Sequence, residues 1–512
     1  MTNMHDLQGA PLLVVGAGIM GSGIAQVAAQ AGHPVQLFDT REGAAEAAKA
    51  RLATTLAGLV AKGRLTEGAA QAALARITPR ASLAGLTEAP GVQCVVEAVV
   101  EDLPAKRALF QQLEGLVSAD CVLATNTSSI SVTAIANGLL HPGRLVGMHF
   151  FNPVPLMKLV EVVSGLHTEP AVAAAIFELS RHWGKTPVHA RSTPGFIVNR
   201  IARPYYAETL ALLLEQAATP QVLDACLRAA GFRMGPCELM DLIGHDTNLA
   251  VTQSVFDANF QDKRYMPSLL QAAMVAGGWL GRKSGRGFYR YGADGAGAPA
   301  LPVALFEAPA TAREVTVHGA DAIADFLDMA ATAALAEQGW GPARQRDSPW
   351  TGLEVDAQHL VLTDGRTARD MAAALGTHQV AVFDRPLQLP AAPGTALAFA
   401  VDAQASEDWR KQAGHWLAAL GFAPLPVADV PGLVVARTVA MLVNEAADAV
   451  LQGVCTQAGA DAAMKLGVNY PAGPFEWLAR WGSAGVLQLL DALDSQYRGE
   501  RYRASPWLRR QA

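Results

Sequence analysis

The sequence predicts an α/β domain built on a parallel sheet, then an all-α domain, and then a degenerate repeat of the same pair. Three observations support this prediction. Near the amino terminus a buried strand runs into a glycine-rich turn and a helix, helical periodicity dominates from residue 193, and short motifs recur 237 residues later. The expected parts are an α/β domain at 1–192, a helical domain at 193–290, a linker at 291–310, a degenerate α/β domain at 311–429 and a second helical domain at 430–512.

The composition excludes several classes of function. The chain has 512 residues, a hydrophobic fraction of 51% and a net charge of -6, and no block of Lys and Arg stands out, so we expect no nucleic-acid partner. Its five cysteines lack a Cys-x-x-Cys pattern, which favours reduced thiols over disulfides or a zinc site. Because neither a signal peptide nor an apolar stretch of about twenty residues is evident, we expect a cytoplasmic protein without a membrane partner.

The first strand leads into a turn with glycines at Gly16, Gly18 and Gly21. In a Rossmann-type domain the first glycine allows a tight turn, the second lets the backbone approach a pyrophosphate, and the third packs the helix on the sheet. Asp39 ends the next strand, where a carboxylate binds ribose hydroxyls and repels a 2′-phosphate. The pattern predicts NAD as the cofactor, although Arg41 weakens the preference over NADP. The alternative is a glycine-rich turn without a ligand.

Polar residues follow two further predicted strands. The strand from Gly91 runs towards Glu101, with Lys106 on the next helix, and the strand from Cys121 ends in Asn126-Thr-Ser128-Ser129. Carboxyl ends of parallel strands face the ligand crevice, so Asn126 and Ser128 are candidates for contact with substrate or nicotinamide. The alternative interpretation is that Ser128 or Ser129 caps a helix.

Residues 147–163 read as a strand, a turn stiffened by two prolines, and a second strand. If the two strands fold back on each other, Glu161 reaches one ring nitrogen of His149. That contact would fix the histidine tautomer and leave the other nitrogen free to take a proton. The alternative is a core histidine beside an unrelated glutamate.

These motifs occur in one order across residues 10–290, and together they closely resemble the L-3-hydroxyacyl-CoA dehydrogenase family. The resemblance rests on the glycine turn at Gly16, on Asn126-Thr-Ser128-Ser, on His149-Phe-Phe-Asn152-Pro and Glu161, on Pro194-Gly-Phe-Ile-Val-Asn199-Arg, on Met234-Gly-Pro236, and on Gly281-Arg-Lys283-Ser-Gly-Arg-Gly-Phe-Tyr.

The resemblance implies roles for individual residues. His149 would be the general base and Glu161 its orienting acid, while Ser128 and Asn199 would hold the 3-oxygen of the substrate. Positions that contact NAD in the family match Asp39, Glu101, Lys106, Ser128 and Lys283, besides the three glycines. Asn152 and Arg233 are further candidates for substrate contact, individual coenzyme A contacts stay unassigned, and no metal is expected.

The second half repeats the helical motifs without the polar groups. Residues 194–200 are echoed at 431–437, Glu208 at Glu445, and residues 235–238 at 473–476. The glycine turn and the His-Phe-Phe-Asn-Pro motif are missing from 311–428, and Ala436 stands where Asn199 stands in the first copy. We therefore expect a structural copy, with the two helical domains packed as an internal pseudo-dimer. A homo-oligomer stays compatible with the sequence.

The resemblance implies NAD-dependent oxidation of an L-3-hydroxyacyl-CoA thioester to the 3-ketoacyl-CoA. As a stand-alone enzyme with a duplicated helical domain, the chain resembles the 3-hydroxybutyryl-CoA and 3-hydroxyadipyl-CoA dehydrogenases of butyrate and phenylacetate metabolism. Arg233 would pair with the distal carboxylate of an adipyl chain, or it is a surface arginine. The alternatives are a beta-hydroxyacid dehydrogenase of the 6-phosphogluconate type, which relies on a catalytic lysine, and a non-catalytic crystallin-like relative.

Overall fold

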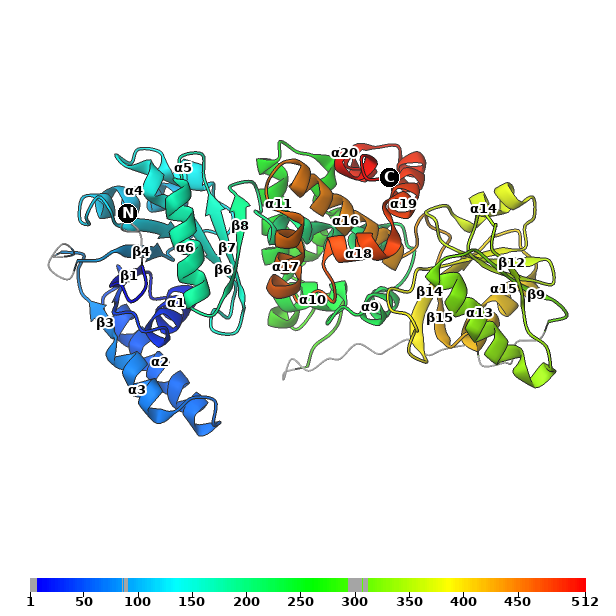
Figure 1. Ribbon diagram of the computed structural model, residues 1–512, viewed down its shortest axis with the longest axis horizontal. Coiled ribbons are helices and arrows are strands. Elements are labelled where there is room, and N and C mark those ends of the chain that lie inside the picture. The colour runs from blue at the N-terminus through cyan, green and yellow to red at the C-terminus, as the bar shows by residue number, and fades with distance from the viewer. Residues whose placement is uncertain (1–6, 85, 87–90, 293–305, 307–311) are drawn as a thin grey trace. The chain divides into compact units, whose positions relative to one another are not determined.

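The computed structural model describes residues 7–84, 86, 91–292, 306 and 312–512, shown in Figure 1. The chain divides into two compact units, the first made of Met1–Arg200 with Gln452–Val468 and the second of Ile201–Leu451 with Asn469–Ala512. Nearly all of the linker expected at 291–310 lies outside the described residues. The division into five parts made from the sequence stays a prediction.

The first unit contains an eight-stranded sheet in the order β3-β2-β1-β4-β5-β6-β7-β8. All neighbouring strands are parallel except β6 and β7, which are antiparallel. Strands β1, β4 and β5 are wholly buried, as strands covered on both faces must be. The strands are β1 (Leu12–Val15), β2 (Val35–Phe38), β3 (Ile77–Arg80), β4 (Cys94–Glu97), β5 (Val122–Thr125), β6 (Leu145–Phe150), β7 (Leu159–Ser164) and β8 (Thr186–Arg191).

Helices cover this sheet, and one of them comes from the far end of the chain. α17 (Gln457–Gly467) packs on β7 and β8, and a methyl group at Gly467 would lie 2.7 Å from the Leu159 side chain. The core beneath the other helices joins Leu12 and Val14 of the sheet to Ile24 and Ile176. These helices are α1 (Ile19–Gln30), α2 (Ala44–Ala61), α3 (Glu67–Ala75), α4 (Leu103–Glu114), α5 (Val132–Ala136) and α6 (Pro170–His182). The short α7 (Val198–Ile201) follows at the end of the unit.

The second unit contains a smaller sheet, one end of which repeats the strand pattern of the first sheet. Its order is β10-β9-β11-β12-β13-β14-β15, with β12 and β13 parallel, β13 and β14 antiparallel, and β14 and β15 parallel. The last four strands therefore repeat the pattern of β5 to β8. The strands are β9 (Val315–His318), β10 (Ala343–Gln345), β11 (Gly352–Val355), β12 (Gln358–Leu362), β13 (Val380–Phe383), β14 (Thr395–Val401) and β15 (Phe422–Pro426), accompanied by α13 (Ala322–Leu335), α14 (Ala368–Leu375) and α15 (Glu407–Ala419).

The rest of the second unit is helical and comes from two distant parts of the sequence. The earlier helices are α8 (Arg203–Leu214), α9 (Pro220–Ala229), α10 (Pro236–Ile243), α11 (His245–Ala258) and α12 (Leu269–Ala276). The later ones are α16 (Val435–Leu451), α18 (Pro474–Trp481), α19 (Ser483–Tyr497) and α20 (Pro506–Arg509). α8 packs on α16, and α9 packs on β14 of the smaller sheet.

Buried ion pairs join the two sets of helices in a reciprocal way. Glu208 accepts hydrogen bonds from Arg501 at 2.8 Å and Tyr502 at 2.9 Å. Its repeat counterpart Glu445 accepts from Arg264 at 3.3 Å and from Tyr265, the residues that correspond to Arg501 and Tyr502 at the same spacing of the repeat. Each copy therefore supplies a carboxylate to the other copy's arginine and tyrosine.

Membrane spans and metal sites are both absent from the described residues. None of the helices there combines the length and the apolar content that a membrane span requires. In the same part of the chain, no group of three or more His, Cys, Asp or Glu side chains is placed to hold a metal ion.

Candidate active site

His149 and Glu161 face each other across the antiparallel strands β6 and β7. The Nδ1 atom of His149 lies 2.5 Å from Oε2 of Glu161. Both side chains are buried, with 5% of His149 and 0% of Glu161 exposed. With Nδ1–H donating to the carboxylate, Nε2 carries the lone pair and can accept a proton. The contact expected from the spacing of the two residues is present, and its catalytic role stays a proposal.

Glu161 has a second set of partners that fixes its carboxylate. Its Oε1 accepts hydrogen bonds from the backbone N–H groups of Ile197 and Val198, each at 3.0 Å. The chain reaches this position through Phe196, whose φ of 47° is rare for a residue with a side chain. Because one oxygen is held by the backbone at the start of α7, the other stays directed at the imidazole.

The surroundings of the imidazole are aromatic and well ordered by hydrogen bonds. The rings of Phe151 and Phe196 lie 4.6 and 5.7 Å from the ring of His149. Asn126, which the sequence suggested for ligand contact, accepts the N–H of Phe150 through its side-chain oxygen at 2.8 Å. The amide therefore ties the end of β5 to the end of β6, beside the histidine.

The glycine turn after β1 has the space that a dinucleotide needs. Gly16 has a φ of 107°, and a methyl group there would lie 2.4 Å from the carbonyl oxygen of Ala98. A methyl group at Gly21 would lie 1.7 Å from the carbonyl oxygen of Gly16, whereas one at Gly18 would meet nothing within 4 Å. Gly16 and Gly21 are thus required by packing, and Gly18 leaves an open approach to the backbone. These residues fit NAD.

Asp39 lies directly after β2 and next to the glycine turn. It accepts the N–H of Ala17 at 2.8 Å, and its Oδ1 lies 3.1 Å from Nε of Arg41. Partial burial acts to raise the pKa of Asp39, but the hydrogen bonds from Arg41 and Ala17 outweigh it and lower that pKa. A carboxylate that stays ionised at this position suits ribose hydroxyls and disfavours a 2′-phosphate.

Glu101, Lys106 and Ser128 form one network at the carboxyl ends of β4 and β5. One oxygen of Glu101 accepts from Thr127 Oγ1 at 2.7 Å, from Ser128 N at 2.8 Å and Oγ at 3.3 Å, and from Ser129 N at 2.9 Å. Burial acts to raise the pKa of Glu101, but the bond from Thr127 and the charge of Lys106 lower it overall. The helix cap of α5 is Ser131, so the alternative interpretation of Ser128 or Ser129 as a cap is wrong.

Lys106 is more deeply placed than a surface cofactor contact would be. Its side chain is 1% exposed and lies 2.6 Å from Glu97 and 3.4 Å from Glu101. Asn199 lies on α7 and is half-buried, and Asn152 is exposed directly beyond β6. The cofactor role of Lys106 and the substrate roles of both asparagines stay predictions.

The other two candidates belong to the second unit. Lys283 forms an ion pair with Asp246 at 2.5 Å. Arg233 is exposed, and within the described residues its guanidinium has neither an ion pair nor a hydrogen bond. The cofactor role of Lys283 and the substrate role of Arg233 stay predictions.

The second unit holds a counterpart of this site that the sequence did not reveal. Asp384 follows β13 and donates its N–H to Ala398 of β14, so these two residues occupy the register positions of His149 and Glu161. The Asp384 carboxylate accepts from the N–H groups of Val434, Val435 and Ala436 at 2.6 to 3.0 Å. Burial raises its pKa to about 6, against the effect of these bonds. The second copy thus keeps a carboxylate that binds the start of the following helix. This carboxylate stands at the position of His149 and not at that of Glu161, and it has no imidazole partner.

Comparison with known proteins agrees with this architecture. The family model described as "3-hydroxyacyl-CoA dehydrogenase, NAD binding domain" matches residues 12–193, and "3-hydroxyacyl-CoA dehydrogenase, C-terminal domain" matches 195–291 and 432–512. A third, "3-hydroxybutyryl-CoA dehydrogenase reduced Rossmann-fold domain", matches residues 360–431.

Relatives match at two different lengths. A 3-hydroxyadipyl-CoA dehydrogenase of Escherichia coli (strain K12) is 42% identical over 98% of this chain and 96% of its own. A crystal structure of 3-hydroxybutyryl-CoA dehydrogenase from Escherichia coli K12 has a TM-score of 0.86 and 41% identity, covering 98% of both chains. A probable 3-hydroxybutyryl-CoA dehydrogenase of Bacillus subtilis (strain 168) is 41% identical over 55% of this chain and 96% of its own. This chain therefore belongs to the 3-hydroxyacyl-CoA dehydrogenase family.

Proposed function

We propose that His149 is the general base of this NAD-dependent 3-hydroxyacyl-CoA dehydrogenase and that Glu161 holds it in the reactive tautomer. The observation that carries the proposal is the buried contact of 2.5 Å between His149 Nδ1 and the Glu161 carboxylate. A histidine with its Nδ1–H bound to a carboxylate keeps Nε2 as the basic atom. Glu161 would also stabilise the imidazolium that forms when the proton arrives.

The chain's own groups account for the proton transfer and the binding of the oxygen. Ser128 and Asn199 hold the 3-hydroxyl of the substrate, and His149 Nε2 removes its proton. NAD, bound along the glycine turn and Asp39, supplies the hydride acceptor for C3. The bond from Ser128 Oγ to Glu101 is the longest of the five that this oxygen accepts, at 3.3 Å, so this hydroxyl gives up little by turning towards a substrate.

We propose that the substrate is 3-hydroxyadipyl-CoA, whose short acyl chain ends in a second carboxylate. The competing candidate is 3-hydroxybutyryl-CoA, which lacks that carboxylate. A relative named for 3-hydroxyadipyl-CoA matches this chain over almost its whole length. Arg233 is exposed and, in the part of the chain that the structure describes, has no carboxylate partner, so it is available to a carboxylate of the substrate.

The substrate proposal is tested by following NADH formation on both thioesters. We expect Arg233→Met to lower kcat/KM for the 3-hydroxyadipyl thioester about 10-fold or more while leaving the 3-hydroxybutyryl thioester nearly unchanged, since only the first carries a second carboxylate. An equal loss on both substrates would rule out this role of Arg233. No NADH formation with any 3-hydroxyacyl-CoA would favour the non-catalytic alternative instead.

We also propose that the two sets of helices form an internal pseudo-dimer and that the chain resides in the cytoplasm. The reciprocal contacts of Glu208 and Glu445 support the first proposal, because two-fold related copies exchange the same groups. The five cysteines are free thiols and four of them are buried, which supports the second. The oligomeric state of the chain is measured by light scattering.

A further inference from the structure

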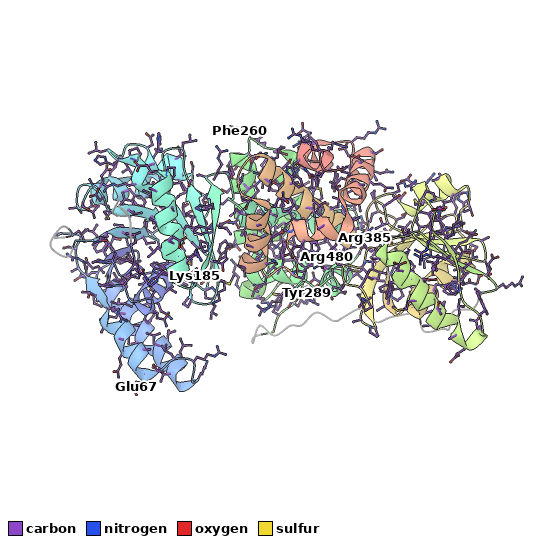
Figure 2. All side chains as sticks on the ribbon, viewed as in Figure 1. Glu67, Lys185, Phe260, Tyr289, Arg385 and Arg480 are labelled. Atoms are coloured by element: carbon purple, nitrogen blue, oxygen red, sulfur yellow. The ribbon has the colours of Figure 1, made fainter. Side chains whose placement is uncertain are left out.

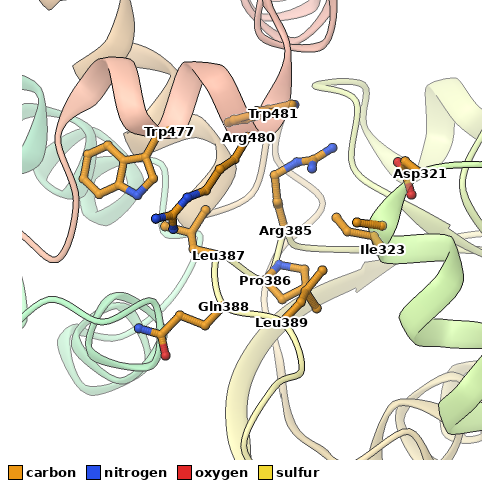
Figure 3. Close-up of a pocket in the computed structure, with 11 residues that line it drawn as sticks. Asp321, Ile323, Arg385, Pro386, Leu387, Gln388, Leu389, Trp477, Arg480 and Trp481 are labelled. Carbon is orange, nitrogen blue, oxygen red and sulfur yellow. The ribbon is translucent and has the colours of Figure 1, made fainter.

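A cavity of about 570 Å³ lies in the second unit (Figure 3). Its lining comes from the start of α13, from the loop that follows β13, and from one face of α18. The lining residues are Asp321, Ala322, Ile323, residues 385–389, Trp477, Arg480 and Trp481. A volume of this size is typical of small-molecule sites, which measure roughly 300–1,000 Å³.

The cavity lies at the carboxyl edge of the smaller sheet. β9 is antiparallel to β11 and β11 to β12, while β12 is parallel to β13, so β9 and β13 point the same way. Two parts of the lining, residues 321–323 and 385–389, follow the ends of those two strands. Ligands of open α/β sheets bind at this edge. In the first unit the glycine turn follows β1 and His149 lies near the carboxyl end of β6.

The turn after β9 nevertheless cannot hold a pyrophosphate as the turn after β1 can. Gly319 keeps a φ of 102°, close to the 107° of Gly16. The third residue after the strand, however, is Asp321 where the first copy has Gly18. Its carboxylate caps α13 by accepting the N–H of Ala324 at 2.8 Å, so the helix start is already occupied by a negative charge. An anion in this cavity must therefore bind at a position other than the start of α13.

Two arginines offer that binding position. In the described part of the chain, neither Arg385 nor Arg480 uses its guanidinium in a hydrogen bond or an ion pair. The guanidinium carbon of Arg385 lies 4.5 Å from the ring centre of Trp481, and its Nε is buried without a partner. Burial lowers the pKa of Arg385 to about 10, against the attraction of Asp321 and Asp384. A phosphate would supply the missing acceptors for this half-buried guanidinium.

The remaining walls suit a flat apolar ring. Trp477 is buried, Trp481 is half-buried, and Ile323 and Pro386 are buried beside them. Figure 3 shows the guanidinium of Arg385 beside Trp481 and that of Arg480 towards Leu387 and Trp477, so the two cations lie at different parts of the lining. Aromatic rings stack well on indole and guanidinium faces.

We propose that this cavity binds an adenine mononucleotide, with the base against the tryptophans and apolar side chains and the phosphates on Arg385 and Arg480. In this proposal the second copy keeps a nucleotide site although it lacks the glycine turn. Two arginines bind the phosphates, a role that the helix N-terminus has in the first copy. The proposal goes beyond the dehydrogenase activity, because none of the catalytic or cofactor candidates contributes to this site.

Calorimetric titration of ADP into the full chain tests the proposal. We expect one more ADP site per chain in the wild type than in Arg385→Gln/Arg480→Gln, since ADP also binds the NAD site of both proteins. Arg369→Gln, an exposed arginine of the same domain that does not line the cavity, should behave as the wild type. NADH affinity and kcat at saturating NAD should be equal in all three proteins.

Three results would overturn the proposal. The first is equal ADP stoichiometry in the wild type and the double variant. The second is loss of the extra site in Arg369→Gln as well. The third is an inorganic phosphate titration that matches ADP in affinity, because then the base contributes nothing. If the double variant melts early, Arg480→Gln alone decides, since the Arg480 side chain is exposed, and we expect ADP to bind the extra site at least 10-fold more weakly.

Discussion

Changing Glu161 to glutamine tests the account of the catalytic pair most specifically. The substituted amide keeps the shape of the carboxylate but has one acceptor and one donor end. Two backbone N–H groups, those of Ile197 and Val198, approach Oε1 at 3.0 Å, so the amide oxygen must turn towards them. The NH2 group then faces Nδ1 of His149 across 2.5 Å, and Nδ1 must accept instead of donate.

The consequence is the wrong tautomer of the base. With Nδ1 accepting, Nε2 carries the hydrogen and cannot take the proton of the substrate. We expect kcat to fall by about 10³- to 10⁴-fold, which corresponds to roughly 4 to 5.5 kcal/mol. NADH binding should stay within about 2-fold, since the glycine turn and Asp39 are untouched, and the unfolding free energy should fall by about 1–3 kcal/mol.

Asp384→Asn is the matched control within the same chain. Asp384 is a buried carboxylate that caps the repeat counterpart of the same segment, through Val434, Val435 and Ala436, but faces Ala398 where Glu161 faces a histidine. We expect a similar loss of stability, measured by urea denaturation, with kcat unchanged. Equal losses of kcat in both variants, or a Glu161→Gln enzyme within about 3-fold of the wild type, would refute the reasoning.

Three further predictions concern charged groups around the first unit's sheet. Asp39→Asn should raise the KM for NAD about 10-fold and leave kcat nearly unchanged in steady-state assays, because it weakens ribose binding only. Lys106→Met should lower the unfolding free energy by about 3–5 kcal/mol in urea, because Glu97 is left buried without its partner at 2.6 Å. Burial lowers the pKa of Lys185 (Figure 2) from 10.5 to about 8, so its protonated form is disfavoured in the folded state. Stability should therefore rise by up to about 3 kcal/mol between pH 8 and 10.5, a rise that Lys185→Met should abolish.

Some of the site follows directly from local sequence. The contact of His149 with Glu161 was predictable because prolines 153 and 155 stiffen the short turn between two strands, and antiparallel strands place the residues at equal distances from a turn opposite each other. The glycine turn and Asp39 were predictable for a similar reason, since each glycine has a steric requirement that the structure shows. Such signals depend on neighbours within about 25 residues.

Other parts depend on contacts that no local pattern encodes. The hydrogen bonds from Ile197 and Val198 to Glu161 require a positive φ at Phe196. Phenylalanine rarely adopts this conformation, so the sequence does not predict it. The position of α17 in the first unit depends on the packing of Gly467 against Leu159, about three hundred residues earlier. The strand register places Ala398 at the position of Glu161, and only the hydrogen bonds of the structure show that Asp384 supplies the capping carboxylate instead.

The central claim, that one histidine removes the proton while the rest of the site binds the cofactor, is tested most directly by His149→Gln. Single-turnover NADH formation and NADH affinity are measured on the same preparation. We expect turnover to be lost to the background rate while NADH affinity stays within about 2-fold, because the proposed role of His149 is towards the substrate proton and the glycine turn and Asp39 stay unchanged. Loss of both properties together, or retention of turnover, would contradict it.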